Sequence, residues 1–234
     1  MTKNYDSHVV VLKSSIDNVE AAAIIGDKKT SVFKKLLKKP KKSEVQVDSI
    51  RLFYECILKV SGMYEADFFR KAKHTLSVDS NVKEVTFGEK TFSIKEKSAL
   101  KKAFVGSGGK NKVDLPLEEH VFVEEIDDLY VDYNGNEINF PFKVNSKTTE
   151  TYPDKILEEN SPNVKKPKIT NDSAIQLLQD LIKKPLHNEI RNLKEKFTVL
   201  EIMEVYVPIY EARLTGPKGK AGLLRLDAVR KKVL

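Results

Sequence analysis

The chain has 234 residues, 40% apolar and 32% charged, a balance typical of a globular protein with one large or two small domains. Its apolar runs are too short to span a membrane, and its first residues lead into no signal-peptide core. The single cysteine, Cys56, excludes an internal disulfide, so we expect a cytoplasmic protein. The formal net charge of +7 favours an anionic partner, because charge governs association rather than fold.

Residues 1–94 are predicted to form an N-terminal α+β unit. Residues 8–12 are an apolar run typical of a strand. Residues 17–25 are Ala-rich and predict a short helix, which Gly26 would close as a C-terminal cap.

A strand-rich region follows within this unit. Residues 50–60 predict a long apolar strand, and Ser61-Gly62 predicts the turn into a second strand over residues 63–71. Residues 85–94 predict a hairpin centred on Gly88.

A lysine run at residues 28–42 is the candidate interaction surface. Four apolar residues lie between the lysines and predict one face of a helix that stops at Pro40: Val32, Phe33, Leu36 and Leu37. The pattern favours a packed helix with a solvated lysine rim. Alternatives are a contact with nucleic-acid phosphates and a segment lying on an anionic membrane. The candidate nucleic-acid-binding residues are Lys34, Lys35, Lys38, Lys39, Lys41 and Lys42.

A similar stretch occurs again near the C-terminus. Residues 36–45 and residues 181–190 share Leu-x-Lys-Lys-Pro followed by a glutamate. Further matches lie downstream in the same order, so we predict an internal duplication of residues 31–85 and residues 174–234. Each copy would contain a helix, a hairpin and a strand that ends at an aspartate, Asp79 or Asp227.

Residues 95–145 are predicted to form a β-rich acidic insert. Its glycines at residues 106–109 lack the spacing of a nucleotide-binding loop and predict a linker. Residues 132–137 carry oxygen donors, but the glycine and glutamate positions of a calcium loop are not matched. Asn134-Gly135 is therefore interpreted as a hairpin turn, and we predict no metal site.

Residues 146–168 are rich in Lys, Ser, Thr, Asn and Pro and predict a linker of limited order. Residues 169–234 then predict a C-terminal α+β unit whose helix is capped by Thr170.

This last unit resembles the PepSY-type module. The resemblance rests on Ile169-Thr170-x-x-x-Ala174, an amphipathic helix, a hairpin and Leu226-Asp227-Ala228 near the C-terminus. It implies a small non-catalytic α+β module, and some members of that family are linked to peptidase inhibition. The usual Thr-Gly after the aspartate is absent, so we expect the topology of the family and not its inhibitor function.

The sequence contains no familiar catalytic motif. The four histidines are far apart in the chain, and none has metal-ligand spacing to another histidine or to cysteine. Cys56 alternates with apolar neighbours and is expected to be a buried, inert thiol. Asp79 and Asp227 could be an acid/base pair, but their position before turns favours backbone hydrogen bonding. We expect no cofactor.

The sequence therefore predicts an α+β fold with two related units of helix plus antiparallel sheet, joined through the acidic insert. The predicted function is a non-catalytic adaptor or regulatory binding protein with a protein partner. Sequence-nonspecific nucleic-acid association through the lysine run is the first alternative. A small-molecule enzyme whose site is assembled from distant residues is the second, and a membrane surface is the least favoured partner.

Overall fold

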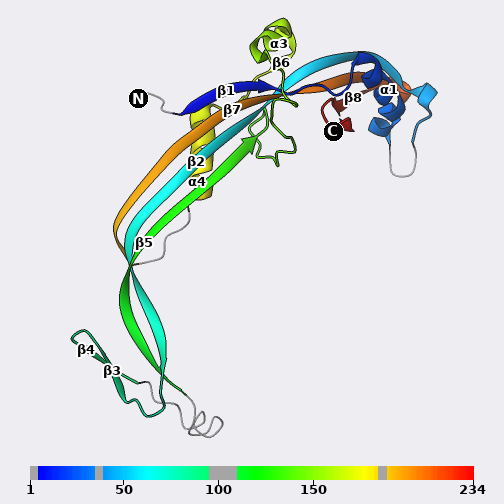
Figure 1. Ribbon diagram of the computed structural model, residues 1–234. Coiled ribbons are helices and arrows are strands. Elements are labelled where there is room, and N and C mark those ends of the chain that lie inside the picture. Colours follow the sequence, from blue (N-terminus) through cyan, green and yellow to red (C-terminus); the bar gives the residue numbers. More distant parts are fainter. Residues whose placement is uncertain (1–4, 35–38, 95–109, 184–188) are drawn as a thin grey trace. The chain divides into compact units, whose positions relative to one another are not determined.

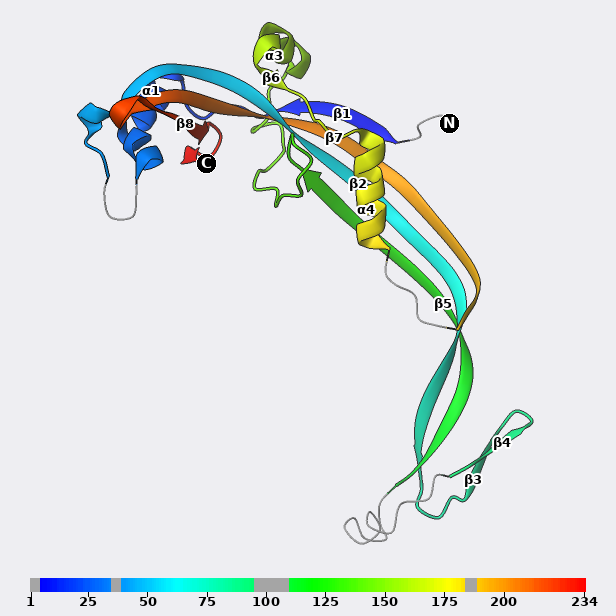
Figure 2. The same ribbon diagram turned by 180° about the vertical axis from the view of Figure 1, so that it is seen from behind.

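The computed structural model describes residues 5–34, 39–94, 110–183 and 189–234 (Figures 1 and 2). Contacts divide the chain into two compact units. Unit 1 contains Met1–Met63, Ile126–Lys183 and Phe197–Leu234, and unit 2 contains Tyr64–Glu125 and Lys184–Lys196. The expected boundaries after residues 94, 145 and 168 do not coincide with these units, because three long strands each contribute residues to both.

The fold class is confirmed at the level of mixed helix and antiparallel sheet, with the sheet predominating. The strands of the main sheet are β1 (Asp6–Val11), β2 (Gln46–Val78), β5 (Asn111–Val131), β6 (Val164–Lys165), β7 (Ile190–Gly216), β8 (Lys220–Asp227) and β9 (Lys232–Val233). Their order is β5-β2-β7-β8-β9, while β1 pairs with β7 and β6 pairs with β2. Both of these added strands run parallel to their partners.

Strands β7 and β8 form an antiparallel hairpin, in register from Ile209↔Asp227 to Gly216↔Lys220. Strand β2 also runs antiparallel to β7 in unit 1, because its hydrogen-bonded partners occur in reverse order. Asp48 contacts Thr215, whereas Lys59, further along β2, contacts Glu201.

The described helices are α1 (Asn18–Lys28), η1 (Lys29–Phe33), η2 (Lys42–Glu44), α3 (Pro153–Glu159), η3 (Ser161–Asn163), α4 (Asn171–Ile182) and η4 (Pro217–Gly219). Helices α1 and α4 each begin at a side-chain cap. Asp17 caps α1, and Thr170 caps α4 as predicted. Both views show α1 beside β8 and α4 against the sheet of unit 1 (Figures 1 and 2). The predicted stop at Gly26 is wrong, because α1 continues to Lys28 and directly into η1.

The lysine run does not form the predicted helix in its described part. The 3-10 helix η1 ends at Phe33, and Lys34 is extended. Phe33 is nevertheless buried, since its ring fills the space over Gly216 and Gly222. A Cβ atom at these glycines would approach the ring to 2.6 Å and 2.5 Å. This burial fits the packed interpretation of the segment, whereas Leu36 and Leu37 lie outside the described residues.

The predicted turn at Ser61-Gly62 is also wrong, because β2 passes through both residues without interruption. Gly62 permits close packing rather than a turn. A Cβ atom there would lie 2.8 Å from the Phe197 ring and 3.0 Å from Leu178. The first predicted copy therefore lacks the hairpin that β7 and β8 form in the second, and the structure does not confirm the duplication.

In unit 2, the acidic side chains of β5 face basic side chains of β2. Arg70 Nε lies 2.8 Å from Glu119 Oε2, and Lys73 Nζ lies 2.9 Å from Asp114 Oδ2. The predicted hairpin is confirmed as β3 (Glu84–Phe87) and β4 (Lys90–Ser93), with Gly88 at a φ of 60°. Residues 95–105 of the predicted acidic insert and its glycines at 106–109 lie outside the described residues.

The predicted linker at 146–168 is ordered. It contains α3, η3 and β6, and Thr149 forms a bridge with Leu12. The reason is apolar burial, since Ile156, Leu157 and Val164 pack against a buried cluster that includes Tyr206.

Candidate functional site

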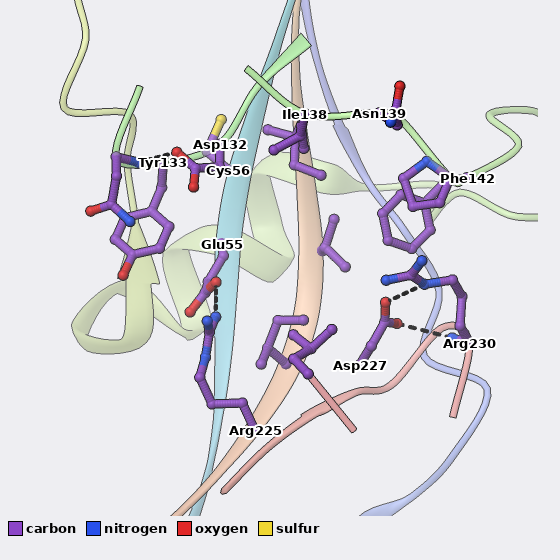
Figure 3. Close-up of a pocket in the computed structure, with 16 residues that line it drawn as sticks. Glu55, Cys56, Asp132, Tyr133, Ile138, Asn139, Phe142, Arg225, Asp227 and Arg230 are labelled. Carbon is purple, nitrogen blue, oxygen red and sulfur yellow. Dashed lines mark hydrogen bonds and ion pairs between the residues drawn. The ribbon is translucent and has the colours of Figure 1, made fainter. Parts of the chain in front are cut away.

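An open cavity of about 530 Å³ lies in unit 1, formed by β2, the turn after β5, β7 and the C-terminal residues (Figure 3). This volume is in the range of small-ligand sites. Its apolar lining consists of Ile57, Ile138, Phe142, Val207, Ile209 and Leu234. Strand alternation explains why most of the strand residues in the lining are odd-numbered. Odd-numbered residues of β2, β7 and β8 share the face of the sheet that borders the cavity.

One side of the cavity is closed by an ion-paired carboxylate. Glu55 is only 8% exposed and accepts hydrogen bonds from Arg225 Nη2 and, at 2.8 Å, from Lys165 Nζ. Lys165 Nζ also lies 3.4 Å from Glu211 Oε2. Burial alone would lower the pKa of Lys165, but the hydrogen bond and charge of Glu55 outweigh it, so the pKa is raised. The ammonium is therefore held in its charged form.

A second pair, Asp227 with Arg230, lies across the cavity (Figure 3). Asp227 is buried and accepts from the backbone N–H groups of Val229 and Arg230, both at 2.9 Å. Arg230 Nε donates to Asp227 Oδ2 at 2.6 Å, and its guanidinium lies 4.9 Å from the Phe142 ring centre. The predicted turn role of Asp227 is thus confirmed.

The predicted turn role of Asp79 is confirmed in the same way, since its Oδ1 accepts from the backbone N–H of Asn81 at 2.9 Å. The predicted turn at Asn134-Gly135 is confirmed too, and it forms part of the cavity rim. Asp132 Oδ1 accepts from the backbone N–H groups of Asn134 and Asn136, each at 2.9 Å. Burial raises the pKa of Asp132, yet these hydrogen bonds lower it more, so the net shift is downward. The carboxylate organises the turn.

Cys56 is buried, as predicted, at 1% exposure. Burial is the main cause that raises the pKa of its thiol well above the usual range, and the nearby Glu204 charge adds to this. A thiol that stays protonated is a poor nucleophile. The cavity therefore offers apolar surface, hydrogen-bonding amides such as Asn139, and ionised groups that are already paired.

The described lysines of the run do not line this cavity. Lys34, Lys39, Lys41 and Lys42 are exposed, and Lys42 Nζ pairs with Asp27 at 2.7 Å. Lys35 and Lys38 lie outside the described residues.

Sequence reasoning did not identify Glu55, Arg225 or Arg230 as site residues. One signal was present, because Glu55 is an ionisable residue inside an apolar strand.

No family model, no curated protein and no solved structure matches this chain. The resemblance to PepSY-type modules therefore stays a prediction. Within the described ranges, no group of three or more His, Cys, Asp or Glu side chains is arranged to hold a metal ion. The helices of the described part are all too short or too polar to cross a bilayer.

Proposed function

We propose that the protein is a non-catalytic binding protein, an adaptor that holds a protein partner at the cavity of unit 1. One observation supports this proposal above the others. The cavity is open and of ligand size, while its ionised residues Glu55, Asp227, Arg225 and Arg230 already neutralise one another.

Chemistry by acid/base or nucleophilic catalysis requires a group that can exchange a proton or attack a substrate. The paired carboxylates and the protonated Cys56 are poorly suited to either role. Apolar surface beside paired charges is instead suited to receiving an apolar side chain of a partner. Contact between the two removes apolar area of both from water.

A cavity-filling substitution tests the cavity itself. Ile138→Trp places an indole in the cavity lining, and Leu177→Trp adds the same ring at an exposed position of α4 as a matched control. Nile red, a neutral dye that brightens in apolar surroundings, should bind the wild type and the control, and its fluorescence should fall in Ile138→Trp. Equal fluorescence in all three proteins would contradict a ligand-accepting cavity.

A photo-crosslinking residue tests the partner. Placed at Asn139 on the cavity rim, it should form a discrete adduct in cells that survives nuclease treatment. The same group at Val19, an exposed residue of α1, should not form that adduct. An identical adduct at both positions would argue against a partner docked at the cavity.

Nucleic-acid association remains the alternative function. The exposure of Lys34, Lys39 and Lys41 supports it, since phosphate contacts need accessible cations.

A further inference from the structure

The Lys165 ammonium is enclosed by four groups of the protein. Its Nζ lies 2.8 Å from Glu55 Oε1 and 3.4 Å from Glu211 Oε2. It also lies 4.6 Å from the ring centre of Phe53 and 5.4 Å from that of Tyr133. Two carboxylates and two aromatic faces are a chemistry that recognises an ammonium cation. We name these four residues the ammonium cage.

Lys165 belongs to the segment of residues 161–168, which few backbone contacts attach to the sheet. Strand β6 pairs with β2 at only two positions, Tyr54↔Val164 and Glu55↔Lys165. Pro162 and Pro167 flank β6, and proline has no N–H to extend the pairing. Because strand side chains alternate, Val164 packs into the buried cluster while Lys165 enters the cage.

Two further contacts hold the end of the segment. The backbone N–H of Lys168 donates to the carbonyl of Tyr133 at 2.9 Å, and its Nζ donates to Asn134 Oδ1 at 2.8 Å. Both acceptors belong to residues that line the cavity. The segment therefore docks along the cavity rim.

The charges of the cage would be unbalanced without Lys165. Glu55 would keep its ion pair with Arg225, but Glu211 would lose the Lys165 ammonium that lies 3.4 Å from its Oε2. The largely covered Glu211 carboxylate would attract another cation, because leaving its charge unpaired is costly. The vacated cage would thus bind a primary ammonium.

We infer that residues 161–168 are a built-in ligand, which an extended, lysine-bearing peptide of a partner protein displaces from unit 1. Such a peptide adds to β2 as β6 does and places its lysine in the cage. The inference rests on the proposed function, because Glu55 and Tyr133 belong to both the cage and the cavity lining. A residue next to the peptide lysine would fill the cavity.

This arrangement sets a threshold for binding. The segment competes as part of the same chain, so its effective concentration is high. A free lysine side chain is too weak a competitor, and a partner succeeds only by adding cavity and backbone contacts. The segment therefore selects for peptides that place a lysine in the cage, fill the cavity and pair with the backbone of β2.

Chemical rescue tests the cage. Lys165→Ala removes the atoms of a propylammonium, so adding n-propylammonium should raise the melting temperature of this variant by about 3 °C or more. The wild type, and Lys155→Ala in an exposed helical lysine, should respond no more than to sodium ion. Propanol, which has the same length and no charge, should not rescue. Equal responses in Lys165→Ala and Lys155→Ala overturn the inference.

Lysine acetylation tests displacement in the wild-type protein, with no variant that must fold. Lys165 should be acetylated more slowly than its exposed neighbour Lys166. At a concentration above the effective concentration of the built-in segment, an isotope-labelled peptide that copies residues 160–168 should speed acetylation of the protein's own Lys165, and the same peptide with Lys165→Ala should not. Unchanged acetylation overturns the inference. The Nile red result is independent of Lys165, so it reports on the proposed function alone.

Discussion

Individual glycines in this chain serve different purposes that depend on what lies opposite their missing Cβ. Gly216 and Gly222 admit the Phe33 ring, and Gly62 admits Phe197. Gly26 faces open space within α1, with nothing inside 4 Å of an added Cβ. A contact with a distant residue therefore explains why glycine occupies positions 62, 216 and 222, whereas no such contact explains Gly26.

These differences predict opposite effects of the same substitution. Gly222→Ala should destabilise the protein by about 1–3 kcal/mol, because the new methyl group overlaps the Phe33 ring. Gly26→Ala should stabilise it by about 0.5–1 kcal/mol, since alanine loses less backbone entropy in a helix. Urea unfolding measures both free energies. A neutral Gly222→Ala would show that Phe33 does not occupy this position.

At the scale of elements, local signals set where helices begin, and packing sets where strands and helices end. Thr170 begins α4 by accepting a hydrogen bond from the backbone N–H of Ser173. Helix α4 then buries Ala174, Leu178 and Ile182, at the spacing of one helical face. Leu177 and Leu181, which precede Leu178 and Ile182 in the chain, are exposed.

The cap of α4 can be tested by a conservative pair of substitutions. Thr170→Ala should cost about 1 kcal/mol of unfolding free energy, because a helix-terminal N–H loses its acceptor. Thr170→Ser keeps the hydroxyl and should cost little. Chemical denaturation with circular dichroism provides the measurement, and equal losses for both variants would show that the hydroxyl is not the stabilising group.

At the scale of the molecule, charge is arranged differently in the two units. Basic side chains of β2 neutralise acidic side chains of β5 in unit 2, whereas the described lysines of the run are mostly exposed in unit 1. The described lysines of the run are thus accessible to an anionic partner, and association through them is the property that distinguishes the two candidate functions.

The adaptor proposal predicts that the lysine run is dispensable. Replacing Lys38, Lys39, Lys41 and Lys42 by Gln should leave the Asn139 crosslink unchanged, because the described members of this set, Lys39, Lys41 and Lys42, do not line the cavity. If the run bound phosphates, duplex DNA affinity would fall steeply with salt, and the variant would show a flatter salt slope. Fluorescence anisotropy across a salt series measures that slope. A crosslink lost together with DNA binding would favour nucleic acid as the partner.

Local chemistry made several features predictable from the sequence. The first strand, the Thr170 cap, the hairpin around Gly88 and the turn at Asn134-Gly135 depend on residues close together in the chain. The burial of Cys56 followed from alternation within an apolar strand. Each of these features has a local cause, so the sequence alone is enough to predict it.

Only the tertiary structure decided the candidate site and the course of β2. The sequence marks Gly62 as a turn residue, but the Phe197 ring opposite it makes the glycine a packing site in an unbroken strand. Glu55, Lys165 and Arg225 are far apart in the chain, and pairing of β6 with β2, together with the order of the sheet, brings their charges together. Strand register is a long-range property, because a shift of one residue would turn each of these side chains to the opposite face.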